Sequence, residues 1–478
     1  MASIAPEAGS EFFTMKHLPL SRSQEQLRDS NQQLSNWKWS EREGWNMAPD
    51  CWQEFNSNWS SATTQWPDKT IDGKLLLSHP EGLSENQTRT LIIREEYKTL
   101  FEQVYYTGLQ CPRSGALITE QPGVGKSCFQ YYLLARLLQQ GQVVLISLDG
   151  VNIFLFYFDK VYAASMTNSE LVQYPSGSTK NLLSIWSLVD TDTGNSEPCP
   201  GLLNNKFLVQ SAPPDPARYK CWTKQKDAVV FGMKIWTREE IYLALQYETE
   251  YPTLVEELTD AYGQTSRPAT VIDKHMMTET IMPQSPFLGD SPEGRIRTYL
   301  QVANFLYRVR TSRSSCSNDE EFTVETAISS LLDEAIYHFG YVARDVLAGV
   351  FRLESQSLYH KEALVSQSLD SLHDIVNSIR GGRALSPSSH RLIVQRPIPP
   401  TSHLDLLMRV QWSCHFKSAW IMQQLFEKLI KVQDMEVHAG NYFIFNQTYR
   451  EESMNRSLEP LLREFSMKAI NGGLGISS

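Results

Sequence analysis

The chain has 478 residues, a net charge of −10 and a pI near 5.6. This length predicts two or three domains, and the acidic balance argues against a general binder of nucleic acid or anionic membranes. The seven scattered cysteines lack metal-ligand spacing and indicate reduced thiols. We recognise neither a signal peptide nor a bilayer-spanning apolar run, so we expect an intracellular protein of the cytoplasm or nucleus.

Residues 1–87 are expected to form a polar, irregular N-terminal extension that is rich in tryptophan. It contains six of the eleven tryptophans: Trp37, Trp39, Trp45, Trp52, Trp59 and Trp66. Aromatic side chains with a polar group suit a surface that binds a protein partner or a second copy of the chain. The alternative, which we favour, is a small cap whose indoles pack on the neighbouring domain.

Residues 88–275 are expected to form an α/β core. A short extended lead-in precedes an amphipathic helix with Tyr97, Leu100, Phe101 and Val104 on one face. Apolar runs then predict strands at 116–118, 142–148, 182–190 and 206–211, with a hairpin-like insert at 151–162. Because such strands alternate with helices, the pattern predicts a parallel sheet covered on both faces.

The segment from Gly115 to Phe129 reads as a buried strand, a glycine-rich turn and a helix. Its residues 120–127, Glu-Gln-Pro-Gly-Val-Gly-Lys-Ser, approach the Walker A pattern of a P-loop NTPase. In that loop, backbone N–H groups surround the phosphates of ATP, the lysine reaches the β and γ oxygens, and the serine holds Mg2+. The residues expected at the nucleotide are Gln121, Pro122, Gly123, Val124, Gly125, Lys126, Ser127 and Cys128.

Glu120 departs from the pattern, which has glycine at that position. A carboxylate about 6 Å from a triphosphate would cost on the order of 3 kcal/mol per charge pair at an effective dielectric near 20. This cost falls if the side chain points to solvent or toward magnesium. Two functions therefore stay open: an ATPase with slow or regulated hydrolysis, and a non-enzymatic interaction scaffold with a degenerate loop. A phosphotransferase would need a second pocket that we cannot locate in the sequence.

Acidic residues near the end of the third strand are candidates for magnesium chemistry. Asp190 ends an apolar run, and a carboxylate there would hold Mg2+ opposite Ser127. Asp192 could polarise the attacking water, with a solvated turn as the alternative. We therefore expect Asp190 and Ser127 to be the metal ligands.

Polar residues after the fourth strand are candidates for sensing the γ-phosphate. Gln210 and Ser211 end that strand, and Arg218 follows where it could stabilise transition-state charge. A solvated basic turn is an equally good interpretation of Arg218. Thr237 and Glu240 have the spacing of a helix-capping box and carry no chemistry.

Residues 276–478 are expected to form a mostly helical domain. Apolar residues three and four apart predict helices at 298–309, 324–351 and 404–432. Five arginines between residues 295 and 313 form a basic cluster, which we interpret as a solvated helix face. Nucleic-acid binding is not indicated, and a homo-oligomer stays open.

The order of the flanking motifs resembles the P-loop ATPase module of Crinkler-type and retrotransposon-hot-spot-type proteins, which is found widely in fungi. The resemblance rests on residues 92–98, 118–127, 188–190, 210–213 and 233–241. It implies nucleotide and magnesium at Lys126 and Ser127, a magnesium acid at Asp190, and sensor positions at Gln210, Ser211 and Arg218. In that family a nuclease-like domain commonly accompanies the ATPase, and some members are secreted effectors. We expect ATP to switch the helical domain or an oligomer between states.

Overall fold

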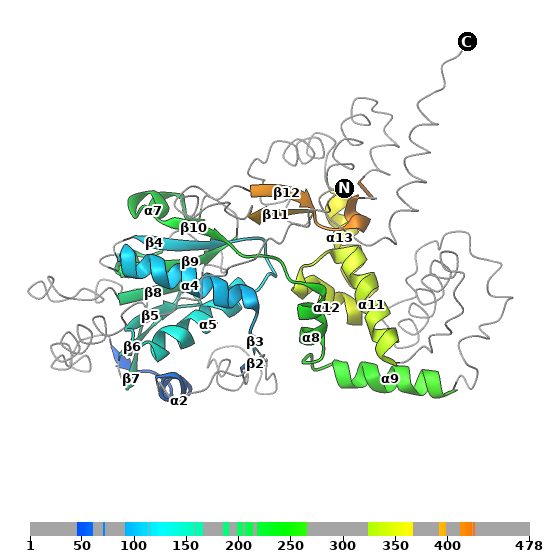
Figure 1. Cartoon of the computed structure of the whole chain (residues 1–478), viewed down its shortest axis with the longest axis horizontal. Coiled ribbons are helices and arrows are strands. Elements are labelled where there is room, and N and C mark those ends of the chain that lie inside the picture. Colours follow the sequence, from blue (N-terminus) through cyan, green and yellow to red (C-terminus); the bar gives the residue numbers. More distant parts are fainter. Residues whose placement is uncertain are drawn as a thin grey trace, which may run out of the picture.

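The computed structural model describes residues 45–60, 70–71, 91–112, 114–157, 159–165, 185–190, 198–203, 206–213, 218–264, 324–366, 392–397, 412–422 and 424–425. Within these ranges an eight-stranded sheet lies beside a group of helices (Figure 1). Several residues named above lie outside the described ranges: Trp37, Trp39, Trp66, Asp192 and the arginines between 295 and 313.

The sheet is mostly parallel, as the sequence predicts. Its strands run in the order β1-β7-β6-β5-β8-β9-β4-β10. Strands β5, β8, β9, β4 and β10 pair parallel with one another in that order. The pairings of β5 with β6, β6 with β7 and β7 with β1 are antiparallel. The bounds are β1 (Asn46–Met47), β4 (Gly115–Thr119), β5 (Val144–Ser147), β6 (Asn152–Tyr157), β7 (Lys160–Ser165), β8 (Ile185–Asp190), β9 (Lys206–Ala212) and β10 (Val229–Gly232).

Both faces of the sheet are buried, which explains why its parallel strands read as continuous apolar runs. Ala116 and Ile118 of β4 pack toward α4 (Glu95–Gln110) and α5 (Lys126–Gln139). Leu117, between them, packs on the opposite face with Trp222 of α7 (Lys220–Gln225) and Leu202 of α6 (Pro200–Leu203). Successive strand residues thus alternate between two cores.

The described part of the N-terminal extension contains one helix and two short strands and is not irregular throughout. Helix α2 (Asp50–Trp59) covers the antiparallel edge of the sheet, and its Trp52 and Trp59 are buried. The rings of Trp52 and Phe154 of β6 lie 5.0 Å apart between centroids. The packing agrees with the cap alternative, and partner binding through this region stays a prediction.

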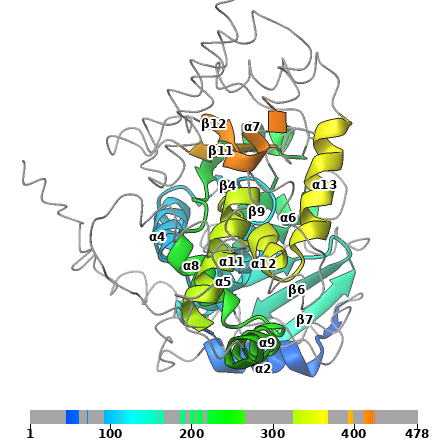
Figure 2. The same ribbon diagram turned by 90° about the vertical axis from the view of Figure 1, so that its right-hand side faces the viewer.

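A second core joins the helices beside the sheet. Its buried residues come from α8 (Arg238–Leu245), α9 (Tyr251–Gln264), α11 (Val324–Phe339) and α12 (Ala343–Phe351). Figures 1 and 2 place these four helices beyond the carboxyl ends of the parallel strands, and we call them the helical layer. Helices α8 and α9 thus pack in the helical layer, although they precede the expected domain boundary at residue 275.

The predicted helix at 324–351 is interrupted at Gly340, which separates α11 from α12. Gly340 has a φ of 68°, and a Cβ there would collide with the backbone carbonyl of Lys417. A left-handed glycine is a common local end of a helix, and the close approach of the distant Lys417 segment leaves no room for a Cβ at this position.

The predicted helix at 404–432 is wrong for its middle part. Residues Trp412–Phe416 form β12, which pairs antiparallel with β11 (Ile393–Pro397). In the described residues of this range, helix begins at residue 419. Leu392, Ile393, Phe416 and Ile421 share a small core with α13 (Leu353–Val365), and this burial outweighs the helical pattern. A second short pair in the described residues, β2 (Thr70–Ile71) with β3 (Leu91–Ile92), includes the expected extended lead-in.

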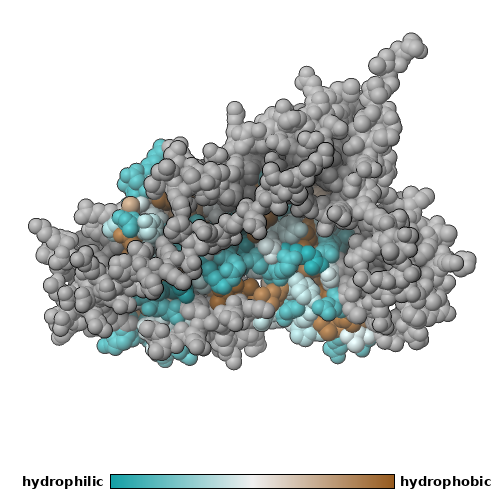
Figure 3. All heavy atoms as spheres, in the orientation of Figure 1, coloured by the Kyte–Doolittle hydropathy of each residue, from teal (hydrophilic) through white to brown (hydrophobic). Residues whose placement is uncertain are grey.

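Among the described residues, no helix combines the length and apolar character needed to cross a bilayer. In the view of Figure 3, hydrophilic residues dominate the visible described surface and hydrophobic residues form small separate areas.

Candidate functional site

The 120–127 loop joins the carboxyl end of β4 to the first turn of α5. Gly123 and Gly125 have φ values of 88° and 97°, a left-handed conformation that glycine adopts without strain. Such turns can direct successive N–H groups into one concavity that binds anions. The first turn of α5 contains no acidic residue, so its positive dipole end is not neutralised there. This geometry can hold an anion.

Lys126 closes the loop in this structure. Its Nζ donates to the backbone oxygens of Glu120 at 2.7 Å and Gln121 at 2.9 Å. The ammonium group therefore lies at the mouth of the loop, where an anion would compete with these two carbonyls. Ser127 follows it and is half-buried.

Glu120 does not point to solvent, which was one of its two expected directions. The residue is fully buried, and its Oε1 accepts the N–H of Gln121 at 3.2 Å. The carboxylate thus occupies a backbone donor at the start of the loop. In its ionised form, this carboxyl group would place a negative charge beside the candidate anion site.

Asp190 ends β8 at the same edge of the sheet as the loop. In the strand register, Asp190 aligns with Ser211 of β9, and Ser211 aligns with Ile118 of β4. The Ser211 hydroxyl lies 3.4 Å from the backbone oxygen of Lys126 and accepts from Gln130 Nε2 at 2.9 Å. Strand β9 therefore lies between β8, which ends at Asp190, and β4, which precedes the loop.

Asp190 lies on the face of the sheet that α5 covers, because it aligns with Ser211, whose hydroxyl contacts Lys126 and Gln130 of α5. Burial raises the pKa of Tyr131 well above its ordinary value, and the negative charges of Cys128, Asp190 and Asp149 raise it further. Asp149 follows β5, but its Oδ1 already accepts the N–H groups of Val151 and Asn152 at 2.8 Å. Asp190, like Glu120, is thus a buried acid at this edge of the sheet.

The structure does not place Gln210 beside the loop, and the role expected for Arg218 stays a prediction. Gln210 lies on the opposite face of β9, where its Oε1 accepts from Trp222 Nε1 and its Nε2 donates to the Arg218 carbonyl at 3.3 Å. Ser211, its neighbour, is the residue that faces α5. Asp192 lies outside the described residues.

Comparisons with known proteins find a partial similarity. No family model matches the chain. It is similar to Crinkler effector proteins 15 and 16 of Phytophthora infestans. Each match has 31% identity over 153 residues, which is 32% of this chain and 24% of the relative. The chain thus spans about a quarter of the length of these relatives. They come from an oomycete, so the fungal distribution expected from the sequence stays a prediction.

Arg344 reaches the loop from the helical layer, and no sequence pattern predicts this. A Cβ built on Gly123 would lie 3.2 Å from the Cβ and 3.5 Å from the Nε of Arg344, in the first turn of α12. A lone arginine in an apolar helical run gives no functional signal. Its position follows only from the break at Gly340.

Aromatic donors behind the loop were also missed. The Tyr97 hydroxyl donates to Gly125 O at 2.9 Å, and Trp236 Nε1 donates to Val124 O at 2.9 Å. The helical face of residues 97–104 is confirmed, yet periodicity identifies Tyr97 only as an apolar residue. Across the described ranges, no group of three or more His, Cys, Asp or Glu is arranged to hold a metal.

Proposed function

We propose that the chain binds ATP with Mg2+ in the 120–127 loop, as a Crinkler-like P-loop NTPase with slow or regulated hydrolysis. The observation that carries this proposal is the combination of two left-handed glycines before α5 with Asp190 at the same sheet edge. The partial similarity to Crinkler effectors supports the Crinkler-like part of this proposal, and it does not bear on ATP binding.

The residues of the loop fit the chemistry of a magnesium-bound triphosphate. Lys126 would leave the carbonyls of Glu120 and Gln121 and meet the β and γ oxygens. Ser127 and Asp190 would supply oxygen ligands to Mg2+, which keeps several waters and phosphate oxygens in its shell. The bound metal would neutralise charge on the phosphates.

The nucleotide would then act on the helical layer. Arg344 lies against Gly123, so an anion in the loop would attract its guanidinium and draw the start of α12 inward. Ordering around a γ-phosphate is a common basis for switching between two states. ATP turnover would reset this contact.

A non-enzymatic scaffold is the second candidate function. The observation that favours it is the buried Glu120, which takes the N–H of Gln121 and adds negative charge to the loop. Weak binding without turnover would follow if this charge were not offset.

The two functions differ in thermal stabilisation by MgATP and in phosphate release. For the ATPase we expect a rise in Tm with MgATP that disappears in Lys126→Ala, together with slow phosphate release. In Asp190→Asn, the dependence of the shift on Mg2+ should be lost. Lys160→Ala, an exposed lysine on β7, is the control and should behave as wild type.

Three results separate the outcomes. Stabilisation without phosphate release supports the scaffold that binds nucleotide. Equal shifts in wild type and Lys126→Ala would contradict the role assigned to the loop. No shift in the wild type at millimolar MgATP would contradict nucleotide binding altogether.

A further inference from the structure

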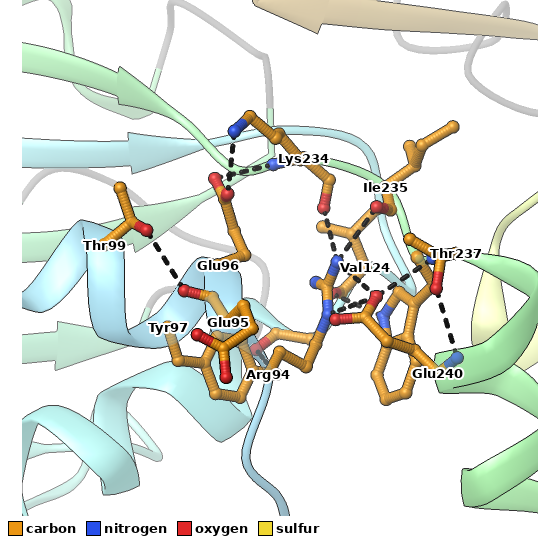
Figure 4. Close-up of polar contacts among 12 residues, drawn as sticks. Arg94, Glu95, Glu96, Tyr97, Thr99, Val124, Lys234, Ile235, Thr237 and Glu240 are labelled. Atoms are coloured by element: carbon orange, nitrogen blue, oxygen red, sulfur yellow. Dashed lines mark hydrogen bonds and ion pairs between the residues drawn. The ribbon is translucent and has the colours of Figure 1, made fainter. Parts of the chain in front are cut away.

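Arg94 is a buried arginine between β3 and α4 whose guanidinium joins three segments of the chain. Only 2% of the residue is exposed. Its Nη1 donates to Val124 O at 3.1 Å, and its Nη2 donates to Lys234 O at 3.0 Å and Ile235 O at 2.9 Å. Figure 4 shows this convergence. A buried guanidinium destabilises the fold unless its N–H donors are paired. Three backbone carbonyls accept from Arg94 here, so its pairing depends on this local backbone geometry.

The same group is held between aromatic rings and a carboxylate. Its central carbon lies 4.7 Å from the Trp236 ring centroid and 5.6 Å from that of Tyr97. Its Nε donates to Glu240 Oε2 at 3.2 Å. A lysine would keep the charge but could not reproduce this planar set of contacts.

Arg94, Trp236 and Tyr97 all bind carbonyl oxygens on one side of the loop. Arg94 and Trp236 both donate to Val124 O, and Tyr97 donates to Gly125 O. Burial raises the pKa of Tyr97 well above its ordinary value, so its hydroxyl keeps the proton that it donates.

The bonded carbonyls determine where the loop amides point. In a trans peptide the C=O and the N–H of the same unit point in opposite directions. The described residues contain no cis peptide bond. The N–H groups of Gly125 and Lys126 therefore point away from Arg94, Trp236 and Tyr97. These are amides of the kind that would bind a phosphate.

Glu240 connects this arrangement to the helical layer. Its Oε2 accepts from Arg94 and also from the Thr237 N–H at 2.9 Å, which is half of the capping box of α8. One carboxylate thus fixes both the arginine behind the loop and the first turn of α8.

We propose that Arg94 is a positioning residue that orients the Gly125 and Lys126 amides toward a bound anion and links them to the start of α8. This inference rests on the proposed nucleotide binding. It assigns to the motif at residues 92–98 a role that does not involve contact with the ligand.

The test is calorimetric titration of the full chain with MgATP, at a temperature where circular dichroism shows each variant to be folded. We expect Arg94→Lys to weaken binding about tenfold or more, because a charged hydrogen bond to the loop is lost. A merely structural role would lower Tm without changing the affinity of the folded protein. Arg238→Lys is the matched control, since Arg238 pairs with Asp333 of α11, and it should bind as wild type.

Two further variants keep the test decisive. Trp236→Phe removes the second donor to Val124 O, so its effect and that of Arg94→Lys should be non-additive. If Arg94→Lys does not fold, Glu240→Gln is titrated in its place. We expect this variant to bind MgATP several-fold more weakly than wild type. Wild-type affinity in the folded substitute, or in folded Arg94→Lys, would overturn this inference and leave nucleotide binding standing. Absence of binding by the wild type would overturn both.

Discussion

Glu120 shows how one residue can limit a binding loop. Its carboxylate is fully buried and accepts the Gln121 N–H, while its carbonyl accepts from Lys126. The side chain therefore withdraws a backbone donor from the ligand and adds a charge of the same sign as a phosphate. Both effects oppose anion binding.

At this scale we predict that Glu120→Gly strengthens MgATP binding by about tenfold or more, since roughly 3 kcal/mol of repulsion is removed. Calorimetric titration with and without Mg2+ measures the change. Glu120→Gln keeps the shape and removes the charge, so it separates repulsion from loop flexibility. Unchanged or weaker binding in both variants would show that the acid is no handicap.

At the scale of elements, α12 is anchored by a buried ion pair in its first turn. Asp345 bonds to Lys417, which precedes the helical segment at 419–422, and Lys417 Nζ lies 3.2 Å from His360 Nε2 of α13. Lys417 is only 8% exposed. The pair thus holds the turn that carries Arg344, although the two residues are far apart in the sequence.

We predict that Asp345→Asn lowers the free energy of unfolding at neutral pH by about 3–5 kcal/mol, because it leaves Lys417 buried without its charge partner. Asp333→Asn breaks a half-exposed pair with Arg238 and should cost about 1 kcal/mol or less. Denaturant unfolding measures both. Equal losses in the two variants would contradict the anchoring role.

The pH dependence of this loss has a definite sign. Burial alone would raise the pKa of Asp345, but Lys417, His360 and Arg344 hold it below its ordinary value of 3.8. A carboxyl group of this kind contributes stability above its unfolded pKa and loses it as pH falls through the folded value. The difference between wild type and Asp345→Asn should therefore be constant near neutral pH and shrink in acid below about pH 4.

At the scale of the whole molecule, the sheet and the helical layer meet at the 120–127 loop. Arg344 of the helical layer approaches Gly123, and Glu240 of the same layer bonds to Arg94 behind the loop. Trp236, just before α8, donates to Val124 O. Nucleotide affinity should thus depend on residues of both parts.

We predict that Arg344→Ala weakens MgATP binding about tenfold, since a guanidinium next to the phosphates is lost. Arg352→Ala is the matched control: both side chains are 63% exposed, and Arg352 pairs with Glu250 away from the loop. Titration of the two variants with MgATP and with adenosine measures the effect, which should be confined to MgATP. An equal loss in both variants, or with adenosine, would contradict a phosphate contact.

The sequence by itself determined the features whose signals are local. Strands that are buried on both faces are mostly apolar, so short apolar runs in the sequence predict β4, β5, β8 and β9. The capping box of Thr237 and Glu240 involves residues three apart, and the structure confirms it. The glycine-rich turn before α5 is likewise predicted by residues that are consecutive in the sequence.

Only the tertiary structure decided which of these features meet. Whether Gln210 or Ser211 faces α5 depends on which side of the sheet that helix covers, and alternation alone cannot tell. The contacts of Arg344 with Gly123 and of Lys417 with Asp345 join residues widely separated in the chain, without a local pattern. The strand at 412–416 replaced a predicted helix because β11 and the core beneath it offered pairing and burial. Such contacts depend on the packing of distant segments, which no local spacing of residue types records.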